Sequence, residues 1–487
     1  MIKYILIFML TFSYIQANDR TKEDITKQAI VKIYNVAKIP NYQSPWSSSM
    51  RSSTGSGAII DGGYILTNAH VVANQAFLEV QRYGERKRYI AKVYAVSHQA
   101  DLALLKVDDE VFFKGVTPLK FGSLPEVEQK IVVYGYPMGG NTLSATIGVV
   151  SRVEHHVYAH SGESFLAVQV DAAVNPGNSG GPALSDGKIV GVVMQVITKS
   201  QNIGYLVPVS MVKHFIEDMK DGHYDGFADL GLGTQKLENP AMRRYYGLDE
   251  NVTGKLIDKI VYNSPAVGIL KEGDIITAID GHKIENDGTV EFRRHEYTDF
   301  YYFVDQHQMG EKVKLDIIRD RRSLRVEVPL TMTGDDMYLV KTTRYDEMPT
   351  YVIYGGYVFS PLTRNLIRST NRNRLKLSCL AGKWREKEKD EVVVLLKVLA
   401  SDISRGDNNF GMWPIDKVNG KPFKDFKEFF SLMEKMKDPY YFLEDNDGIK
   451  VIIDRKEAQE RQKGILKKYN IEYDKSENLR EANVTAP

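Results

Sequence analysis

The stretch NPGNSGGP at residues 175–182 places one serine, Ser179, among small residues that can form a tight, strained turn. Such a turn exposes the hydroxyl and directs nearby backbone N–H groups towards a bound carbonyl. A serine hydroxyl hardly ionises near neutral pH, so it becomes a nucleophile only beside a base that accepts its proton. A third group must orient that base. The rest of the chain contains a candidate for each role.

The candidate base is His70, and the candidate orienting group is Asp101. His70 follows two short strands, predicted at residues 57–60 and 64–67 and joined by an Asp-Gly-Gly turn. Asp101 opens the apolar run DLALLKV, where an unpaired buried carboxylate would be costly. A hydrogen bond from His70 to Asp101 would explain that position. A single histidine or aspartate in such a segment is more often structural, so the inference depends on all three residues together.

The order of these residues separates two possible folds. Residues 177–181 also fit the G-x-S-x-G nucleophile elbow of α/β-hydrolases. That fold has a helix directly after the serine and the chain order Ser, Asp, His. Here Pro182 follows, then a β-branched run at residues 188–197 that predicts a strand. His70 and Asp101 both precede Ser179, which is the order in chymotrypsin-like proteases.

Five sequence blocks resemble those of the HtrA (Deg) family of trypsin-like serine proteases. Three carry the candidate residues, and two lie between or after them; they are TNAHVV at 67–72, DLALL at 101–105, GYPMGG at 135–140, GNSGGP at 177–182 and NIGYLVP at 202–208. The full-length pattern is most similar to the Deg proteases of plant organelles and bacteria. The resemblance implies a mainly β fold: a chymotrypsin-like double β-barrel protease domain followed by two PDZ-like α+β domains.

The resemblance also implies a role for each residue. Ser179 is expected to be the nucleophile, His70 the general base, and Asp101 the group that fixes the His70 tautomer. The backbone N–H groups of Gly177 and Ser179 are expected to form the oxyanion hole. In this family that turn switches between competent and incompetent states, so the triad alone does not imply constant activity. No cofactor is expected.

Three residues are expected to line the S1 pocket by their position relative to the motifs: Val174, Gln195 and Val196. Their character predicts a small or medium aliphatic P1 residue, because no acidic residue is present to select Lys or Arg. The equal alternative is that Val174 and Val196 belong to the barrel core.

Residues 229–233, 264–266 and 270–281 resemble the signatures of a PDZ domain. The loop of Leu230, Gly231 and Leu232 is expected to bind the C-terminal carboxylate of a peptide, which would add to the adjacent strand edge. A second, divergent PDZ-like unit contains residues 356–359, which resemble another carboxylate loop.

The predicted organisation is a signal peptide at 1–17, a protease domain at 25–222, PDZ-like domains at 228–333 and 350–455, and a charged tail at 456–487. A helix is expected to close the protease domain at 210–220. A further helix is predicted at 455–469, with disorder beyond it.

Composition limits the setting of the protein. The 487 residues carry a net charge of +1, which gives no electrostatic case for nucleic acid or membrane binding. The apolar run at residues 4–14 is too short to span a bilayer and predicts a signal peptide cleaved near Ala17. The expected location is a bacterial periplasm; an uncleaved membrane anchor or an organelle is the alternative. Cys379 is the single cysteine, so no intramolecular disulfide forms.

His155, His156 and His160 lie close together, which raises the question of a metal site. Adjacent histidines on a strand point to opposite faces, and no acidic or cysteine cluster joins them, so we predict none. Residues 154–164 are instead expected to be the family's regulatory loop, which relays PDZ occupancy to the oxyanion turn.

The sequence therefore predicts an ATP-independent serine endopeptidase that degrades unfolded or damaged proteins and recruits exposed C-termini through its PDZ domains. The resemblance implies a homo-oligomer, a trimer or a multiple of it, without a nucleic-acid partner or stable membrane insertion. The alternative is a non-proteolytic chaperone or PDZ scaffold. A substitution at His70, Asp101 or Ser179 would have favoured that alternative, and none is present.

Overall fold

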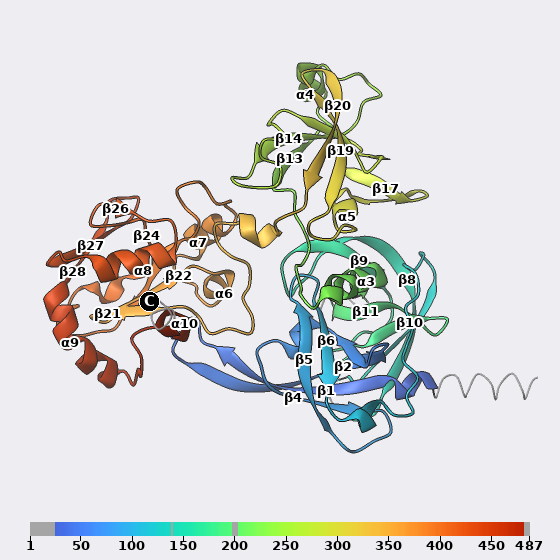
Figure 1. Ribbon diagram of the computed structural model, residues 1–487, viewed down its shortest axis with the longest axis horizontal. Coiled ribbons are helices and arrows are strands. Elements are labelled where there is room, and N and C mark those ends of the chain that lie inside the picture. Colours follow the sequence, from blue (N-terminus) through green and yellow to red (C-terminus); the bar gives the residue numbers. More distant parts are fainter. Residues whose placement is uncertain (1–24, 138–139, 197–202, 482–487) are drawn as a thin grey trace, which may run out of the picture. The chain divides into compact units, whose positions relative to one another are not determined.

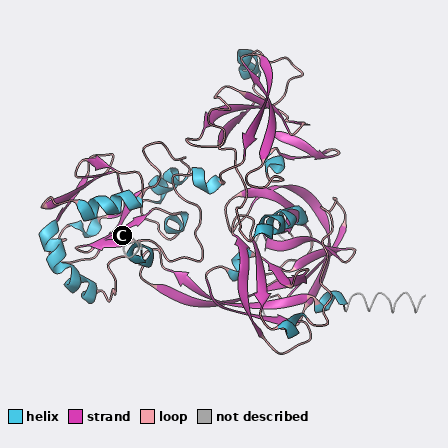
Figure 2. Ribbon diagram, in the orientation of Figure 1, coloured by secondary structure: helices cyan, strands magenta, loops and turns pink. Residues whose placement is uncertain are grey.

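The computed structural model describes residues 25–137, 140–196 and 203–481, with only the backbone of residues 195, 196 and 481. The predicted signal peptide lies outside the described residues. The chain forms two compact units. One contains residues 51–227 with the segments up to 37 and 288–309, and the other contains residues 38–50, 228–287 and those from 310 onward. Strands dominate the secondary structure (Figure 2), as the sequence predicts.

The first barrel closes in the strand order β1-β2-β3-β6-β5-β4 and is drawn in blue in Figure 1. Buried and exposed side chains alternate along much of β5, as expected for strands with one face in a core. The predicted strands at 57–60 and 64–67 are the end of β2 and all of β3. The strands are β1 (Ile30–Pro40), β2 (Ser48–Ile60), β3 (Tyr64–Thr67), β4 (Gln75–Arg82), β5 (Tyr89–Ser97) and β6 (Leu102–Val107).

The second barrel closes in the order β10-β11-β12-β9-β8-β7. The strand predicted at 188–197 is β11, and the predicted closing helix is α3 (Val209–Asp218), which buries Met211, Val212 and Phe215. One apolar cluster continues from the first barrel into this barrel and α3, so the two barrels pack together. The strands are β7 (Lys130–Gly135), β8 (Ser144–Val157), β9 (Ser164–Val170), β10 (Pro182–Ser185), β11 (Lys188–Val196) and β12 (Gly204–Pro208).

Residues 288–309 form a small element that belongs to the same unit as the barrels. It consists of the hairpin β17 (Thr289–Arg293) and β18 (Glu296–Asp299), followed by α5 (Tyr301–Val304). Phe292 and Tyr302 pack against the apolar core of the second barrel, and the Arg293 guanidinium donates to the Pro125 carbonyl at 2.8 Å. This packing brings a segment distant in sequence against the protease barrels.

The second unit contains a sheet in the order β13-β14-β15-β19-β20, in which β16 also pairs with β15. Because β13 ends this order, it is an edge strand of the sheet. The elements are β13 (Leu232–Lys236), α4 (Pro240–Tyr246), β14 (Lys255–Ile260), β15 (Ile275–Ile279), β16 (His282–Lys283), β19 (Lys312–Arg319) and β20 (Arg322–Pro329).

A buried ion pair connects the turn before β15 to the end of β19. The Arg319 guanidinium donates to both carboxylate oxygens of Asp274 at 2.7 and 2.6 Å, and the Asp274 side chain is only 2% exposed. The Lys271 N–H also donates to this carboxylate at 2.8 Å. Removing one partner of such a pair leaves an uncompensated buried charge.

We expect Asp274→Ala to lower the free energy of unfolding of this sheet by about 3 kcal/mol. Urea titration combined with hydrogen exchange of the β15 and β19 amides measures the change. Asp316→Ala is the matched control, because it removes an equally bidentate pair with Arg325 that is largely exposed. Its cost should stay below about 1 kcal/mol. Equal losses in the two variants would contradict the importance of burial.

The last module has two four-stranded sheets, in the orders β21-β22-β23-β24 and β26-β25-β27-β28. The Asp425 carboxylate caps α8 by accepting the Glu428 N–H at 2.7 Å, and the phenylalanines of α8 enter the core. The strands are β21 (Val352–Tyr354), β22 (Tyr357–Pro361), β23 (Val393–Val398), β24 (Gly411–Ile415), β25 (Lys417–Val418), β26 (Lys421–Pro422), β27 (Tyr440–Glu444) and β28 (Lys450–Asp454); the helices are α6 (Arg364–Arg368), α7 (Arg374–Ala381) and α8 (Phe426–Lys435).

The charged segment after β28 is folded as far as residue 481, so the prediction of disorder beyond residue 469 is wrong for those residues. The predicted helix is α9 (Arg455–Lys468), and α10 (Glu477–Glu481) follows it. Ala458, Ile465 and Ile471 are buried, and residue 475 bridges to β21. The sequence analysis predicted disorder because the segment is highly charged, and the few apolar residues that fold it did not alter that composition. No helix within the described residues is long and apolar enough to cross a membrane.

Candidate active site

His70 lies in the single turn of α2 (Ala69–Val72), directly after β3. As the sequence predicts, His70 follows the second of the two short strands, and the turn that carries it is helical. The His70 side chain is 32% exposed, so its outer edge can meet a substrate. The Asn68 amide donates to the Asp101 carbonyl at 2.8 Å and ties the start of this turn to the β5–β6 connection.

Asp101 immediately precedes β6 and is almost completely buried, at 1% exposure. One carboxylate oxygen accepts the backbone N–H of His70 at 2.9 Å, and the other lies 2.7 Å from His70 Nδ1. Its φ of 54° is in the left-handed region, which aspartate tolerates better than most residues. The structure therefore brings the two predicted residues together and leaves His70 Nε2 directed away from Asp101.

The two groups shift each other's pKa. Burial lowers the pKa of His70, but the charge of Asp101 and its hydrogen bond raise it by more, so the pKa lies above the ordinary 6.5. Burial raises the pKa of Asp101, and the charge and hydrogen bonds of His70 then hold it below the ordinary 3.8. The arrangement thus stabilises an imidazolium beside a carboxylate, as the base of a serine nucleophile requires.

Ser179 lies in the loop between β9 and β10, where the two barrels meet. Within the described residues its hydroxyl makes one hydrogen bond, a donation to the Met194 carbonyl at 3.4 Å. Bonds between a catalytic serine and its base are often long without substrate and shorten when substrate binds. The hydroxyl has only this weak bond to break before it turns to His70.

The turn around Ser179 presents two backbone N–H groups. Gly177 has a φ of 99°, which favours glycine because a side chain is strained there. The N–H groups of Gly177 and Ser179 donate to no acceptor among the described residues, although Gly177 is buried. An N–H group that no acceptor of the described residues occupies remains able to donate to the carbonyl oxygen of a substrate.

The predicted S1 residues lie on neighbouring segments of the second barrel. Val174 is buried in the barrel's apolar core, and a side chain at Gly204 would clash with it. Residues 195 and 196 are in β11, and their backbones pair with Tyr205 and Gly204 of β12. Their side chains lie outside the described parts of the structure.

The three neighbouring histidines have three separate environments. His155 Nδ1 lies 2.8 Å from Thr298 Oγ1 of β18, and its other nitrogen lies 3.5 Å from the Asp305 carboxylate. His156 stacks on Tyr205. His160 Nε2 lies 2.9 Å from His98 Nδ1, and its ring centre is 6.1 Å from that of His70.

These contacts place the predicted regulatory segment, residues 154–164, between two features. At one end it contacts the 288–309 segment, and at the other it lies beside the candidate base. The sequence analysis did not identify His98 as a member of this cluster, because a histidine three residues before Asp101 carries no signal in isolation.

The first predicted carboxylate loop is a tight turn before the edge strand β13. Leu230 and Leu232 are buried, and Gly231 has a φ of 68°. The Gly231 N–H donates to the Asp229 carboxylate at 2.8 Å. A peptide carboxylate must therefore displace an internal one to reach this N–H group.

The prediction of a second carboxylate loop at residues 356–359 is wrong. Residues 355 and 356 form the turn of the β21–β22 hairpin, so β22 has neighbours on both sides and no free edge for a peptide. The Gly355 N–H donates to Gln462 of α9, and the Gly356 carbonyl accepts the Leu399 N–H. The glycines at 355 and 356 resemble those of a carboxylate loop but form an internal hairpin turn. The sequence does not show that β21 pairs with β22 at the edge where a peptide would bind.

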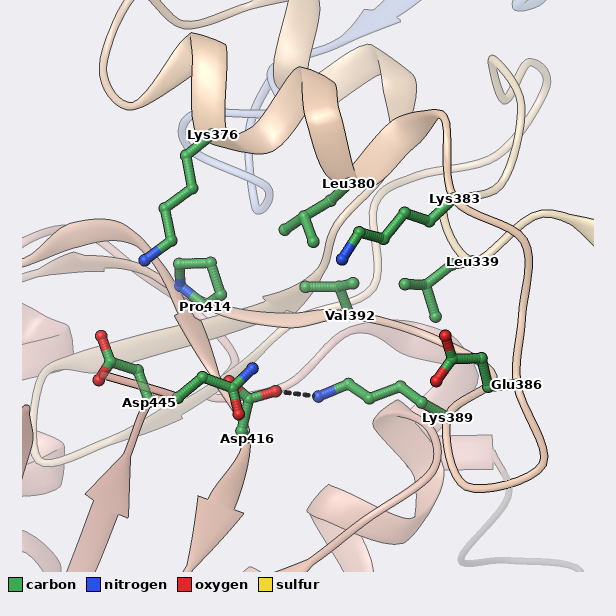
Figure 3. A pocket seen from close by; sticks show the side chains of 11 residues that line it. Leu339, Lys376, Leu380, Lys383, Glu386, Lys389, Val392, Pro414, Asp416 and Asp445 are labelled. Carbon is green, nitrogen blue, oxygen red and sulfur yellow. Dashed lines mark hydrogen bonds and ion pairs between the residues drawn. The ribbon is translucent and has the colours of Figure 1, made fainter. Parts of the chain in front are cut away.

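The last module contains a cavity of about 180 Å³ beside α7 (Figure 3). Leu380, Val392 and Pro414 contribute apolar surface, and three lysines and three carboxylates contribute charge. Lys389 pairs with Asp416 at 2.5 Å. Because the charges of the lining balance, they favour no class of ligand.

Known families match the architecture just described. A trypsin-like peptidase domain matches residues 55–192, and PDZ domains match residues 228–330 and 340–478. The mitochondrial protease Do-like 4 of Arabidopsis thaliana is 39% identical over 413 residues, which cover 84% of this chain and 77% of that protein. This chain belongs to the Do-like (HtrA/Deg) serine proteases. The chloroplastic protease Do-like 2 of the same plant is 36% identical over 467 residues, covering 94% of this chain and 76% of that protein.

The predicted family and fold class are confirmed, and the Do-like protease is a serine endopeptidase. A solved structure of the HtrA-type protease AlgWS227A with a decapeptide has the same fold, with a TM-score of 0.52 and 22% identity. That match covers 64% of this chain and 97% of that chain.

Proposed function

We propose that Ser179, His70 and Asp101 form the catalytic triad of this Do-like protease. One observation carries the proposal. Both oxygens of the buried Asp101 carboxylate hold His70, one through its backbone N–H and one through Nδ1, which fixes the ring and leaves Nε2 for the serine proton. The N–H groups of Gly177 and Ser179, which donate to no acceptor within the described part of the chain, would supply an oxyanion hole beside the nucleophile.

The chemistry then proceeds in two halves. Ser179 Oγ attacks the scissile carbonyl while His70 Nε2 takes its proton, and the two N–H groups stabilise the developing oxyanion. His70 gives the proton to the leaving amine, which leaves an acyl-enzyme. Water attacks the acyl-enzyme by the same route in reverse, and Ser179 regains its proton.

The proposed substrates are unfolded or damaged proteins, cleaved without ATP. Val174, Gln195 and Val196 would line an S1 pocket for an aliphatic P1 residue. The edge strand β13 can accept an extended peptide, whose C-terminal carboxylate would meet the Leu230–Gly231–Leu232 turn. That geometry supports the proposed recruitment of C-termini.

Regulation is proposed to pass through residues 154–164. His155 contacts Thr298 and Asp305 in the 288–309 segment, and His160 lies next to His98 and near His70. A shift of the 288–309 segment would therefore move residues 154–164 and change the position of His160 near His70. Such loops can hold two discrete arrangements.

The remaining predictions concern organisation and location. We propose the boundaries 25–222 for the protease domain, 228–333 and 350–455 for the PDZ-like domains, and a signal peptide at 1–17. The protein would be exported to a periplasm, or act in an organelle, as a trimer or a multiple of it in protein quality control and the stress response.

The test of the substrate class uses unfolded casein and a folded protein of similar size, without ATP. We expect cleavage of casein alone, and faster cleavage when a peptide with a hydrophobic C-terminus is added. Equal cleavage of the two proteins would contradict selection for unfolded chains. Casein that stays intact with and without the peptide would contradict the protease function itself.

The pH dependence of kcat/KM should follow His70, because only the neutral imidazole accepts the serine proton. Since the His70 pKa is raised, activity should fall as the pH drops through a midpoint above 6.5. In Asp101→Asn the groups that raise the pKa are lost, so the remaining activity should have its acid midpoint at lower pH. An unchanged midpoint would mean that another group governs this limb. Initial rates on a peptide reporter across pH measure both profiles.

A further inference from the structure

Ser56 of β2 is fully buried and touches the loop that carries Ser179, although it belongs to the other barrel. Its N–H donates to the Ser179 carbonyl at 2.9 Å. Its hydroxyl donates to the Gly177 carbonyl at 2.7 Å. One residue of the first barrel thus holds two carbonyls on either side of Asn178 in the second.

The Ser56 hydroxyl has a fixed orientation. It accepts the Tyr136 N–H at 2.8 Å, so its single proton is directed to Gly177. The Ser56 carbonyl accepts the hydroxyl of Thr67 at 2.7 Å. All polar groups of Ser56 therefore have partners, and its side chain cannot rotate without breaking two hydrogen bonds.

The Gly177 carbonyl belongs to the planar peptide that joins residues 177 and 178. The N–H of that same peptide donates to the Asn175 carbonyl at 3.0 Å. Both ends of this peptide plane are therefore held. The N–H groups of Gly177 and Ser179 belong to the two flanking peptides. The orientation of the 177–178 peptide therefore determines the directions in which these two N–H groups point.

We propose that Ser56 is a positioning residue for the oxyanion hole, which rests on the proposed function of the Gly177 and Ser179 N–H groups. Its hydroxyl fixes the central peptide so that the two flanking N–H groups converge on the substrate carbonyl oxygen. Preorganised donors stabilise a developing oxyanion far better than donors that must first reorient.

The surroundings make the hydroxyl hard to replace. A Cβ at Gly135 would lie 3.0 Å from Ser56 Oγ and 2.9 Å from the Asn178 Cα. The backbone at Gly135 and Asn178 is therefore tightly packed around the Ser56 hydroxyl. Removing one oxygen frees less space than the share of about 30 Å³ that a water occupies in the liquid. In Ser56→Ala the Gly177 carbonyl loses its donor, and the central peptide can tilt.

Ser56→Ala should lower kcat about 10- to 100-fold, less than the roughly 10²–10³-fold loss that removal of a donor causes. KM should not change, because the groups that contact the bound peptide chain remain. A peptidyl boronate, whose tetrahedral adduct places an oxygen in the hole, should bind the variant more weakly by the same factor as kcat/KM. A non-covalent product peptide should bind both proteins equally.

Thr67→Val is the matched control, because it deletes another buried hydroxyl that bonds to Ser56 itself. It should lower the melting temperature while leaving kcat and boronate affinity unchanged. Ser56→Cys replaces the hydroxyl with a thiol, which is a weaker hydrogen-bond donor on a side chain of similar shape. It should cause an intermediate loss of kcat and of boronate affinity. This variant tests the proposal if Ser56→Ala does not fold.

The proposal is overturned if Ser56→Ala and Ser56→Cys weaken boronate binding no more than Thr67→Val does. It is also overturned if the loss appears in KM. A native enzyme that shows no Ser179-dependent cleavage would instead overturn the proposed function, so the two failures can be told apart.

Discussion

Ser179→Ala will cleave unfolded casein about a million-fold more slowly than the native enzyme, which in practice is no detectable cleavage. Under the proposed mechanism the Ser179 hydroxyl forms the acyl-enzyme, and within the described residues its one hydrogen bond is the long donation to the Met194 carbonyl. The loss should appear in kcat, because the substituted side chain contributes little to peptide binding. Quantified fragments on a gel and a fluorogenic peptide measure it.

Ser185→Ala provides the control for this variant. Ser185 ends the strand β10 that follows the nucleophile loop, and its hydroxyl bonds to Gln129 and the Lys130 carbonyl. It should retain the native rate, since these contacts are remote from His70. Cleavage by Ser179→Ala at a rate near that of Ser185→Ala would assign the nucleophile to another residue.

Asp101→Asn will lower kcat about 10⁴-fold while the protein stays folded. The hydrogen bonds of Asp101 explain this loss of kcat. Both oxygens of Asp101 act as acceptors, one for the His70 N–H and one for Nδ1. An asparagine has one acceptor oxygen, and if it keeps the backbone bond, its NH₂ group faces Nδ1 and places the ring proton on Nε2. The ring then cannot accept the serine proton.

Asp108→Asn is the matched control, because the same change is made at the opposite end of β6. Asp108 is largely exposed and pairs with Lys92, so its loss should not alter the rate. A mild effect of Asp101→Asn, close to that of Asp108→Asn, would show that Asp101 does not orient the base. Circular dichroism of both variants separates loss of function from loss of fold.

The sequence predicted the protease barrels well, because their motifs are local. It also singled out His70 and Asp101, which the structure brings together beside the ends of β3 and β6, two strands that are visible as apolar runs. Ser179 lies in the loop that precedes β10. Chain order and the strand predicted after Pro182 together separated the double barrel from an α/β-hydrolase, and that predicted strand is β11.

Contacts between distant segments could not be predicted in the same way. Ser56 stands in a plain run of small residues, and only the closure of two barrels brings its hydroxyl to Gly177. The β21–β22 hairpin fills an edge that a glycine pattern suggested was open. The charged segment around α9 folds through a few apolar side chains, such as Ile465, that composition averages out.

Labelling with a fluorophosphonate, followed by tandem mass spectrometry, tests the central claim most directly, because this reagent phosphonylates a serine that a base has activated and releases fluoride. We predict one adduct, on Ser179, which forms rapidly in the native enzyme and in Asp108→Asn. It should form far more slowly in Asp101→Asn, and no adduct should form in Ser179→Ala. An adduct on another serine, or casein cleavage by an enzyme whose Ser179 stays unlabelled, would contradict the assignment of Ser179 as the nucleophile.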